Sequence, residues 1–183
     1  PNNPGALRNL GVVLLNQNCF QEAKDIFTRL VQVLEGQPAR VPDLALAHQG
    51  IGAALLWLWG RAATDEARFG LISEAEREFS KTTDMQPNYL PGWIGLGCAL
   101  HAMDRLDEAE WAFRRALAID AHNLLVTERL RAVLEDKLEQ RLFDLGYLSR
   151  LNKPIWDFTP YENRQPIEPA GKPLSETIIE ERR

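Results

Sequence analysis

Three stretches of this chain share one pattern of Gly, Ala and Phe. The copies are Gly11, Ala23 and Phe27; Gly52, Ala75 and Phe79; and Gly97, Ala109 and Phe113. Ala and Phe are four residues apart in all three, and Gly and Ala are 12 apart in the first and third. Repetition at a period of about 34 residues is typical of stacked helical hairpins, because one hairpin cannot bury its apolar face alone. The repeat therefore favours a binding surface over a catalytic pocket.

The residue types have a packing reason. A Gly inside a helix costs roughly 1 kcal/mol relative to Ala, so each repeated Gly marks a place where two helices approach closely. Each Ala is expected to be the small partner on the second helix of its pair. Each Phe is expected to fill the space between that pair and its neighbour.

The third copy resembles the tetratricopeptide repeat (TPR). That family has Trp-x2-Leu-Gly-x2-Tyr, then Ala-x3-Phe-x2-Ala and a closing Pro. The chain has Trp93, Leu96, Gly97, Leu100, Ala109, Phe113, Ala116 and Ala121 at these positions. In the first and second copies Leu7 and His48 replace the Trp. The resemblance covers roughly two thirds of the chain and implies an all-α, right-handed superhelix of three helical hairpins.

The hairpins are expected at about 4–38, 44–88 and 90–122. Residues 35–43 contain Gly36, Pro38 and Pro42 and are expected to form a loop. The opening Pro1-Asn2-Asn3-Pro4 is similar to a junction between two repeats. We therefore expect that this chain is a portion of a longer repeat array. The alternative is a processed N-terminus.

The second hairpin contains an insertion of 11 residues near 57–70, since Gly52 and Ala75 are 23 residues apart. Ser73-x-x-Glu76 predicts a capping box at the start of its second helix. Phe69 is a candidate anchor for the insertion. Trp57 and Trp59 point in opposite directions on a helix, so one is expected to pack and the other to face the groove or a partner. In the third hairpin Asp107 is the predicted N-cap.

Residues 123–150 are expected to form a capping helix. One apolar stripe at helical spacing is expected to face the last repeat, with charged residues in water. Its members are Val126, Leu130, Val133, Leu134, Leu138, Leu142 and Leu145.

Residues 151–183 form a tail with five prolines, which exclude a regular helix over much of it. Its aromatic residues Trp156, Phe158 and Tyr161 are candidate partner-binding residues. Three interpretations are open: the tail folds back over the array, docks on another protein, or links to a further domain.

The sequence offers little for catalysis. The three histidines, His48, His101 and His122, have no carboxylate or Cys at metal-ligand spacing. Five glutamates on predicted helices are interpreted as solvated: Glu74, Glu76, Glu78, Glu108 and Glu110. Cys19 and Cys98 are interpreted as buried free thiols. The net charge of −5, without a basic block, argues against a nucleic-acid partner. We expect no enzyme activity, catalytic residue, metal or cofactor.

The TPR resemblance implies a concave groove lined by the first helix of every hairpin. The candidate groove residues are Arg8, Val12, Leu15, Asn16, Gln49, Ala53, Leu56, Trp57, Ile94, Cys98 and His101. Chaperone-binding TPR domains clamp a C-terminal carboxylate with polar residues here, but Val12, Ala53 and Ile94 are apolar. An apolar groove suits an amphipathic helix or an extended aliphatic segment.

We therefore expect a scaffold or adaptor that binds a protein segment through its groove, insertion or tail. One alternative is the TPR portion of a larger enzyme, such as a glycosyltransferase, and the other is a structural subunit that docks by its tail. No run of residues is long and apolar enough for a membrane span, and a cytoplasmic location is expected.

Overall fold

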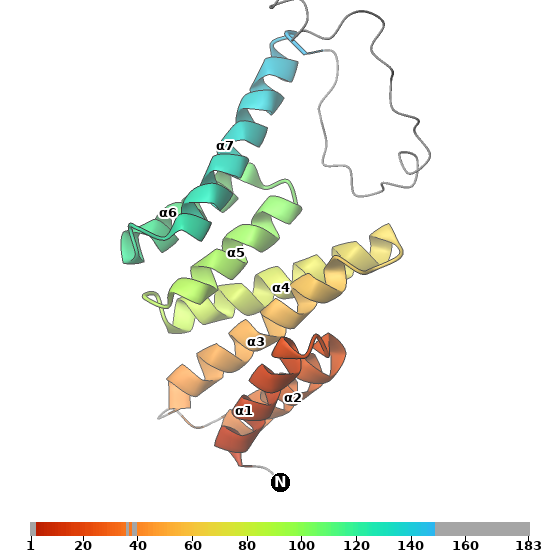
Figure 1. Cartoon of the computed structure of the whole chain (residues 1–183), viewed down its shortest axis with the longest axis vertical. Helices are drawn as coiled ribbons and strands as arrows, with labels where there is room; N and C mark the ends of the chain where they lie inside the picture. The colour runs from red at the N-terminus through yellow and green to blue at the C-terminus, as the bar shows by residue number, and fades with distance from the viewer. Residues whose placement is uncertain (1–2, 36, 38–39, 149–183) are drawn as a thin grey trace, which may run out of the picture. The chain divides into compact units, whose positions relative to one another are not determined.

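The computed structural model describes residues 3–35, 37 and 40–148. These residues contain seven α-helices and no strand (Figure 1). The helices are α1 (Pro4–Asn16), α2 (Phe20–Leu34), α3 (Val41–Trp59), α4 (Asp65–Met85), α5 (Leu90–Ala102), α6 (Leu106–Ile119) and α7 (Leu124–Asp144). The predicted all-α class is confirmed. None of these helices is long and apolar enough to cross a bilayer.

Several helices begin at residues with suitable capping chemistry. The Asn3 side chain accepts a hydrogen bond from the backbone of Ala6, and Pro4 follows it at the start of α1. Asn123 caps α7 in the same way. Such caps satisfy backbone N–H groups that have no partner inside the helix.

Two predicted caps are wrong. The helix expected to start near Ser73 starts at Asp65, because the Thr64 hydroxyl accepts from the backbone of Ala67 and two acidic residues occupy the first turn. Asp107 lies inside the first turn of α6, and the N-cap is Arg105 without a side-chain hydrogen bond. Local residue patterns placed each cap at the wrong polar residue.

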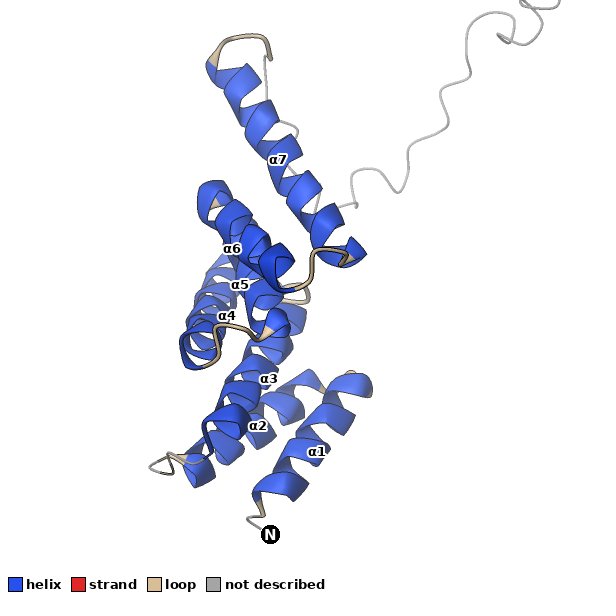
Figure 2. Cartoon of the chain, turned by 90° about the vertical axis from the view of Figure 1, so that its left-hand side faces the viewer, coloured by secondary structure: helices blue, strands red, loops and turns tan. Residues whose placement is uncertain are grey.

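The helices pack as antiparallel neighbours in chain order, from α1 to α7. Figure 2 shows the same succession from the side. In addition, α1 contacts α3, α3 contacts α5 and α5 contacts α7. The first helices of the three hairpins, together with α7, therefore form one layer.

The repeated Gly, Ala and Phe make up the core as predicted. Phe27, Phe79 and Phe113 are at most 1% exposed. A Cβ added to Gly97 would lie 2.7 Å from the Phe113 ring, and the corresponding distances are 2.6 Å at Gly11 and 2.8 Å at Gly52. These close approaches explain why Gly recurs inside helices despite its conformational cost.

Two further glycines close the gaps between hairpins. A Cβ on Gly50 would lie 2.5 Å from the Phe27 ring, and one on Gly95 would lie 2.1 Å from the Phe79 ring. Each of these two Phe rings is thus packed against its own hairpin and the next one. Neither glycine belongs to the Gly, Ala and Phe pattern that the three copies share.

The additional residues of the second hairpin extend both of its helices. The extension continues α3 to Trp59 and starts α4 at Asp65. Trp59 is half-buried against the main core, whereas Trp57 is 59% exposed. Phe69 is 68% exposed, so its predicted role as an anchor is wrong: it lies on the open side of α4.

The predicted apolar stripe of α7 is divided between two environments. Val126 and Val133 are fully buried, and Leu130 packs against the same core. Leu134 and Leu138 are 41% and 58% exposed. The residues that pack on the core lie in the first half of α7, so only this half performs the predicted capping role.

Candidate functional site

The residues predicted to line a groove lie on α1, α3 and α5. We call their combined surface the first-helix face; it comprises Arg8, Val12, Leu15, Asn16, Gln49, Ala53, Leu56, Trp57, Ile94, Cys98 and His101. None of these side chains is buried. Within each helix they follow spacings of three and four residues, which place them on one side of the helix. Because α1, α3 and α5 are neighbours, they form three adjacent rows.

The face is mainly apolar and is partly used by the core. Val12 is 42% exposed. Leu15, Leu56 and Ile94 are half-buried and pack against the core while keeping part of their surface accessible. Anchoring of this kind limits side-chain motion, so less conformational entropy is lost when a ligand binds.

The only cation predicted on this face is paired within the chain. Arg8 Nη1 lies 3.2 Å from Asp43 Oδ1, and Arg40 Nη1 lies 3.2 Å from Asp43 Oδ2. The Asp43 carboxylate therefore offsets the charge of Arg8 within the chain. This contact joins α1 to the start of α3.

His101 and Cys98 lie where α5 meets α7. His101 Nε2 is 2.6 Å from Asp136 Oδ2, so this side chain is engaged by the seventh helix. Burial raises the pKa of the Cys98 thiol, against the opposing effect of the Arg129 charge. A thiol with a raised pKa is a poor nucleophile at neutral pH. The predicted free, buried thiols are free but only half-buried.

Trp57 is held by a neighbouring ring. It stacks on Phe20 of α2 with 5.3 Å between ring centroids and 2° between ring planes. The Arg61 guanidinium lies 4.7 Å from the centroid of the same Phe20 ring. Phe20 is only 3% exposed, so Trp57 is the member of this cluster that presents aromatic surface to solvent.

A buried polar network lies between α3 and α4. His48 Nδ1 is 2.5 Å from Glu78 Oε2, and Lys81 Nζ donates to Glu78 Oε1 over 2.7 Å. Burial by itself would raise the pKa of Glu78, but the hydrogen bonds from His48 and Lys81 lower it below its usual value. Glu78 was predicted to be solvated, and this is wrong because helix α3 covers it. The 30 residues between His48 and Glu78 give no local sequence signal.

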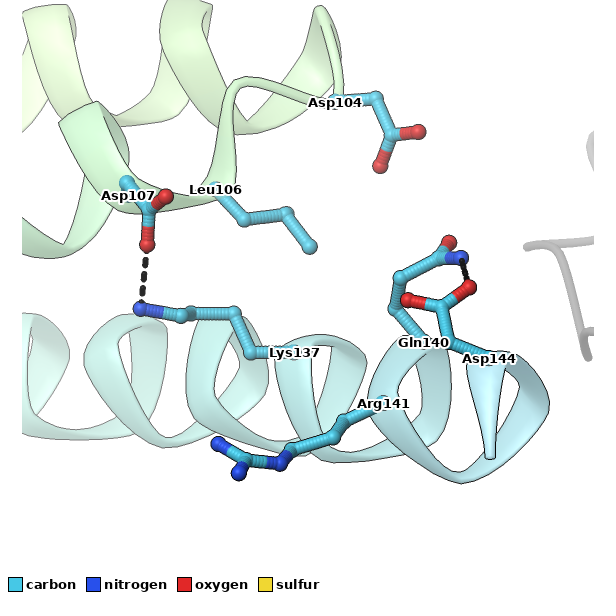
Figure 3. Close-up of a pocket in the computed structure, with 7 residues that line it drawn as sticks. All are labelled: Asp104, Leu106, Asp107, Lys137, Gln140, Arg141 and Asp144. Carbon is cyan, nitrogen blue, oxygen red and sulfur yellow. Dashed lines mark hydrogen bonds and ion pairs between the residues drawn. The ribbon is translucent and has the colours of Figure 1, made fainter. Parts of the chain in front are cut away.

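A separate open pocket of about 440 Å³ lies between α7 and the turn before α6 (Figure 3). It is lined by Asp104, Leu106, Asp107, Lys137, Gln140, Arg141 and Asp144. Lys137 Nζ is 2.6 Å from Asp107, while Arg141 is directed away from it. The charge of Lys137 is thus offset by Asp107 within the chain. Across the described residues, no group of three or more His, Cys, Asp or Glu side chains could hold a metal ion.

The predicted tail residues Trp156, Phe158 and Tyr161 lie outside the described residues. Their role stays a prediction.

Comparisons with known proteins give the fold a wider context. No family model matches the chain. The heat shock protein sti1 homolog of Schizosaccharomyces pombe is 33% identical over 61 residues, which are 33% of this chain and 10% of that protein. The match therefore spans about a tenth of that relative.

Two solved structures align over most of this chain. The first TPR of Spaghetti (RPAP3), bound to the HSP90 peptide SRMEEVD, has a TM-score of 0.59 at 18% identity, and the alignment covers 74% of this chain and 95% of that one. The Sgt2 TPR domain from Aspergillus fumigatus has a TM-score of 0.60 at 17% identity, and the alignment covers 82% of this chain and 87% of that one. These similarities establish the fold.

Proposed function

Because the chain has the tetratricopeptide-repeat fold, we propose that it is a scaffold or adaptor module that holds a segment of another protein against the first-helix face. The observation that carries this proposal is the set of accessible apolar side chains on three adjacent helices. Val12, Ala53 and Cys98 occupy matching places on α1, α3 and α5, each directly after the repeated Gly, and none of them is buried. Accessible apolar rows of this kind fit the apolar side of a peptide.

A solved structure of the same fold supports the idea that such a domain holds a peptide. The RPAP3 domain is bound to a peptide of HSP90. Here the chemistry of the face favours a different class of ligand. Arg8 is already paired with Asp43, and the uncharged Gln49 occupies the matching place on α3. The ligand is therefore an amphipathic helix or an extended aliphatic segment, recognised through its side chains.

A peptide-display selection on the full chain tests the proposal. Random linear peptides are selected, and the tightest are made synthetically and titrated by fluorescence polarisation. Val12→Glu should weaken binding by about tenfold or more, because it buries a charge under an apolar ligand. The matched control is Ile119→Glu on α6, since Ile119 is 37% exposed and Val12 is 42% exposed. Equal losses in the two variants, or no loss in either, would contradict the proposal.

A further inference from the structure

The cluster of Phe20, Trp57 and Arg61 lies at the end of the first-helix face and has features that the rest of the face lacks. Trp57 is on the face, but its ring stacks on Phe20 of α2 at 5.3 Å between centroids. Arg61, in the turn after α3, places its guanidinium on the same Phe20 ring at 4.7 Å. We propose that this cluster is the anchor point for an acidic–aromatic segment of the protein partner. The inference rests on the proposed function and names the chemistry of one part of the ligand.

The geometry prepares Trp57 for binding. One side of its ring is covered by Phe20, which is 3% exposed, yet Trp57 as a whole is 59% exposed. The ring is therefore oriented before any ligand arrives, and its outer surface is open. Binding energy at protein interfaces is concentrated at such large, ordered aromatic residues, because little conformational entropy is lost when they are covered.

The open surface of Trp57 suits a flat aromatic side chain. Stacked and edge-to-face aromatic pairs contribute beyond the area that they bury. A cationic side chain would also be attracted by the indole ring. Arg61 disfavours that alternative, because it already adds a positive charge to the same cluster.

Arg61 supplies the acidic half of the preference. Its side chain is exposed, and among the described residues its guanidinium contacts the Phe20 ring and forms no ion pair. Arg8, the arginine of the first-helix face, is by contrast paired with Asp43. Arg61 is therefore a guanidinium with free donors that contacts the same Phe20 ring as Trp57, and a ligand carboxylate complements it.

The extension of the second hairpin also provides a matched control. Phe69 on α4 is 68% exposed, slightly more than Trp57. Among the described residues, no aromatic ring stacks on Phe69 and no guanidinium lies over its ring. If any exposed aromatic residue on this extension could bind the ligand, the two positions would behave alike.

The test uses peptides selected by display on the full chain. The selected peptides should carry an aromatic residue next to Asp or Glu. Trp57→Ala should weaken their binding by about tenfold or more, and Trp57→Tyr by less. Arg61→Glu, which reverses the charge of an exposed residue in a turn, should weaken binding by a similar factor. Phe69→Ala should leave the affinity unchanged.

Three outcomes overturn the inference. The first is a set of peptides without the acidic–aromatic pattern. The second is an affinity that is unchanged in both Trp57→Ala and Arg61→Glu while Val12→Glu abolishes binding; the proposed function then stands and this inference fails. The third is binding that is insensitive to all of these variants and to Val12→Glu, which contradicts both.

Discussion

Arg8 of α1 and Asp43 of α3 form an ion pair, with 3.2 Å between Nη1 and Oδ1. Arg8 is the one Lys or Arg among the residues of the first-helix face. The pair neutralises that charge within the molecule and also links two of the three helices of the first-helix face.

This pair predicts that the chain does not recognise a C-terminal carboxylate. The HSP90 peptide SRMEEVD should bind equally weakly as the free acid and as the C-terminal amide. In Asp43→Ala the released Arg8 should favour the free acid by at most about fivefold, because exposed ion pairs contribute only about 0–1 kcal/mol. Fluorescence polarisation at low salt measures both affinities. A strong preference of the unmodified chain for the free acid would show that Arg8 is available.

The close packing of Phe79 predicts opposite effects for two glycine substitutions in the second and third hairpins. Gly95→Ala should lower the free energy of unfolding by about 1–3 kcal/mol, because its Cβ would lie 2.1 Å from the Phe79 ring. Gly70→Ala should raise it by about 0.5–1 kcal/mol, because no atom lies within 4 Å of the new methyl group and Ala favours the helix. Urea denaturation compares the two. Equal stabilities for both variants would contradict the packing described between α4 and α5.

The spacing of Gly, Ala and Phe was sufficient to predict the hairpins, because each of these positions is restricted by helix packing: Gly and Ala allow close approach, and Phe fills the core. The glycines between hairpins were missed for a physical reason as well. Gly50 and Gly95 have Asn9 at the matching place in the first hairpin, where α1 packs on no earlier helix among the described residues. A signal present in two copies out of three is hard to distinguish from chance. The start of α4 was missed because Ser73 and Thr64 are both competent caps, and only packing selects between them.

Two turns contain residues in the left-handed region of backbone space. Asn18 and Asp104 both have φ of 60° in the tight connections after α1 and α5. Asn18→Ala and Asp104→Ala should each lower the free energy of unfolding by about 1 kcal/mol, because Ala lacks the short polar side chain that lets Asn and Asp adopt this region. The corresponding Gly variants should not lose stability, since Gly adopts this conformation freely. Thermal and urea unfolding of the four variants decide the point, and equal losses for Ala and Gly would contradict it.

The network around Glu78 predicts a loss of stability in acid. The pKa of Glu78 is lowered in the folded state, so its contribution is fully present above the usual value of 4.5 and is lost as the pH falls through the lower, folded value. Below pH 4.5 the free energy of unfolding should therefore decrease more steeply in the unmodified chain than in Glu78→Gln.

The control for this experiment is Glu66→Gln on the exposed first turn of α4. It should keep the steep acid dependence of the unmodified chain. Identical pH profiles for Glu78→Gln and the unmodified chain would mean that His48 and Lys81 do not favour the charged carboxylate.

The sequence predicted which residues of the candidate site share a face, because helical periodicity determines this. It could not predict their partners. Asp136 is 35 residues from His101 in the chain, and Asp43 is 35 residues from Arg8. Contacts of that range depend on the angles at which helices pack, which no single-sequence pattern contains. The stacking of Trp57 on Phe20 belongs to the same class.

The most direct test of the binding surface is a chemical-shift map. The full chain is labelled with ¹⁵N, and a display-selected peptide is added in steps while amide resonances are followed. The largest changes should occur on α1, α3 and α5, at Val12, Gln49, Ala53, Ile94 and their neighbours, with small changes on α2, α4 and α6. Changes concentrated on the second helices of the hairpins, with the first-helix face unaffected, would contradict the account.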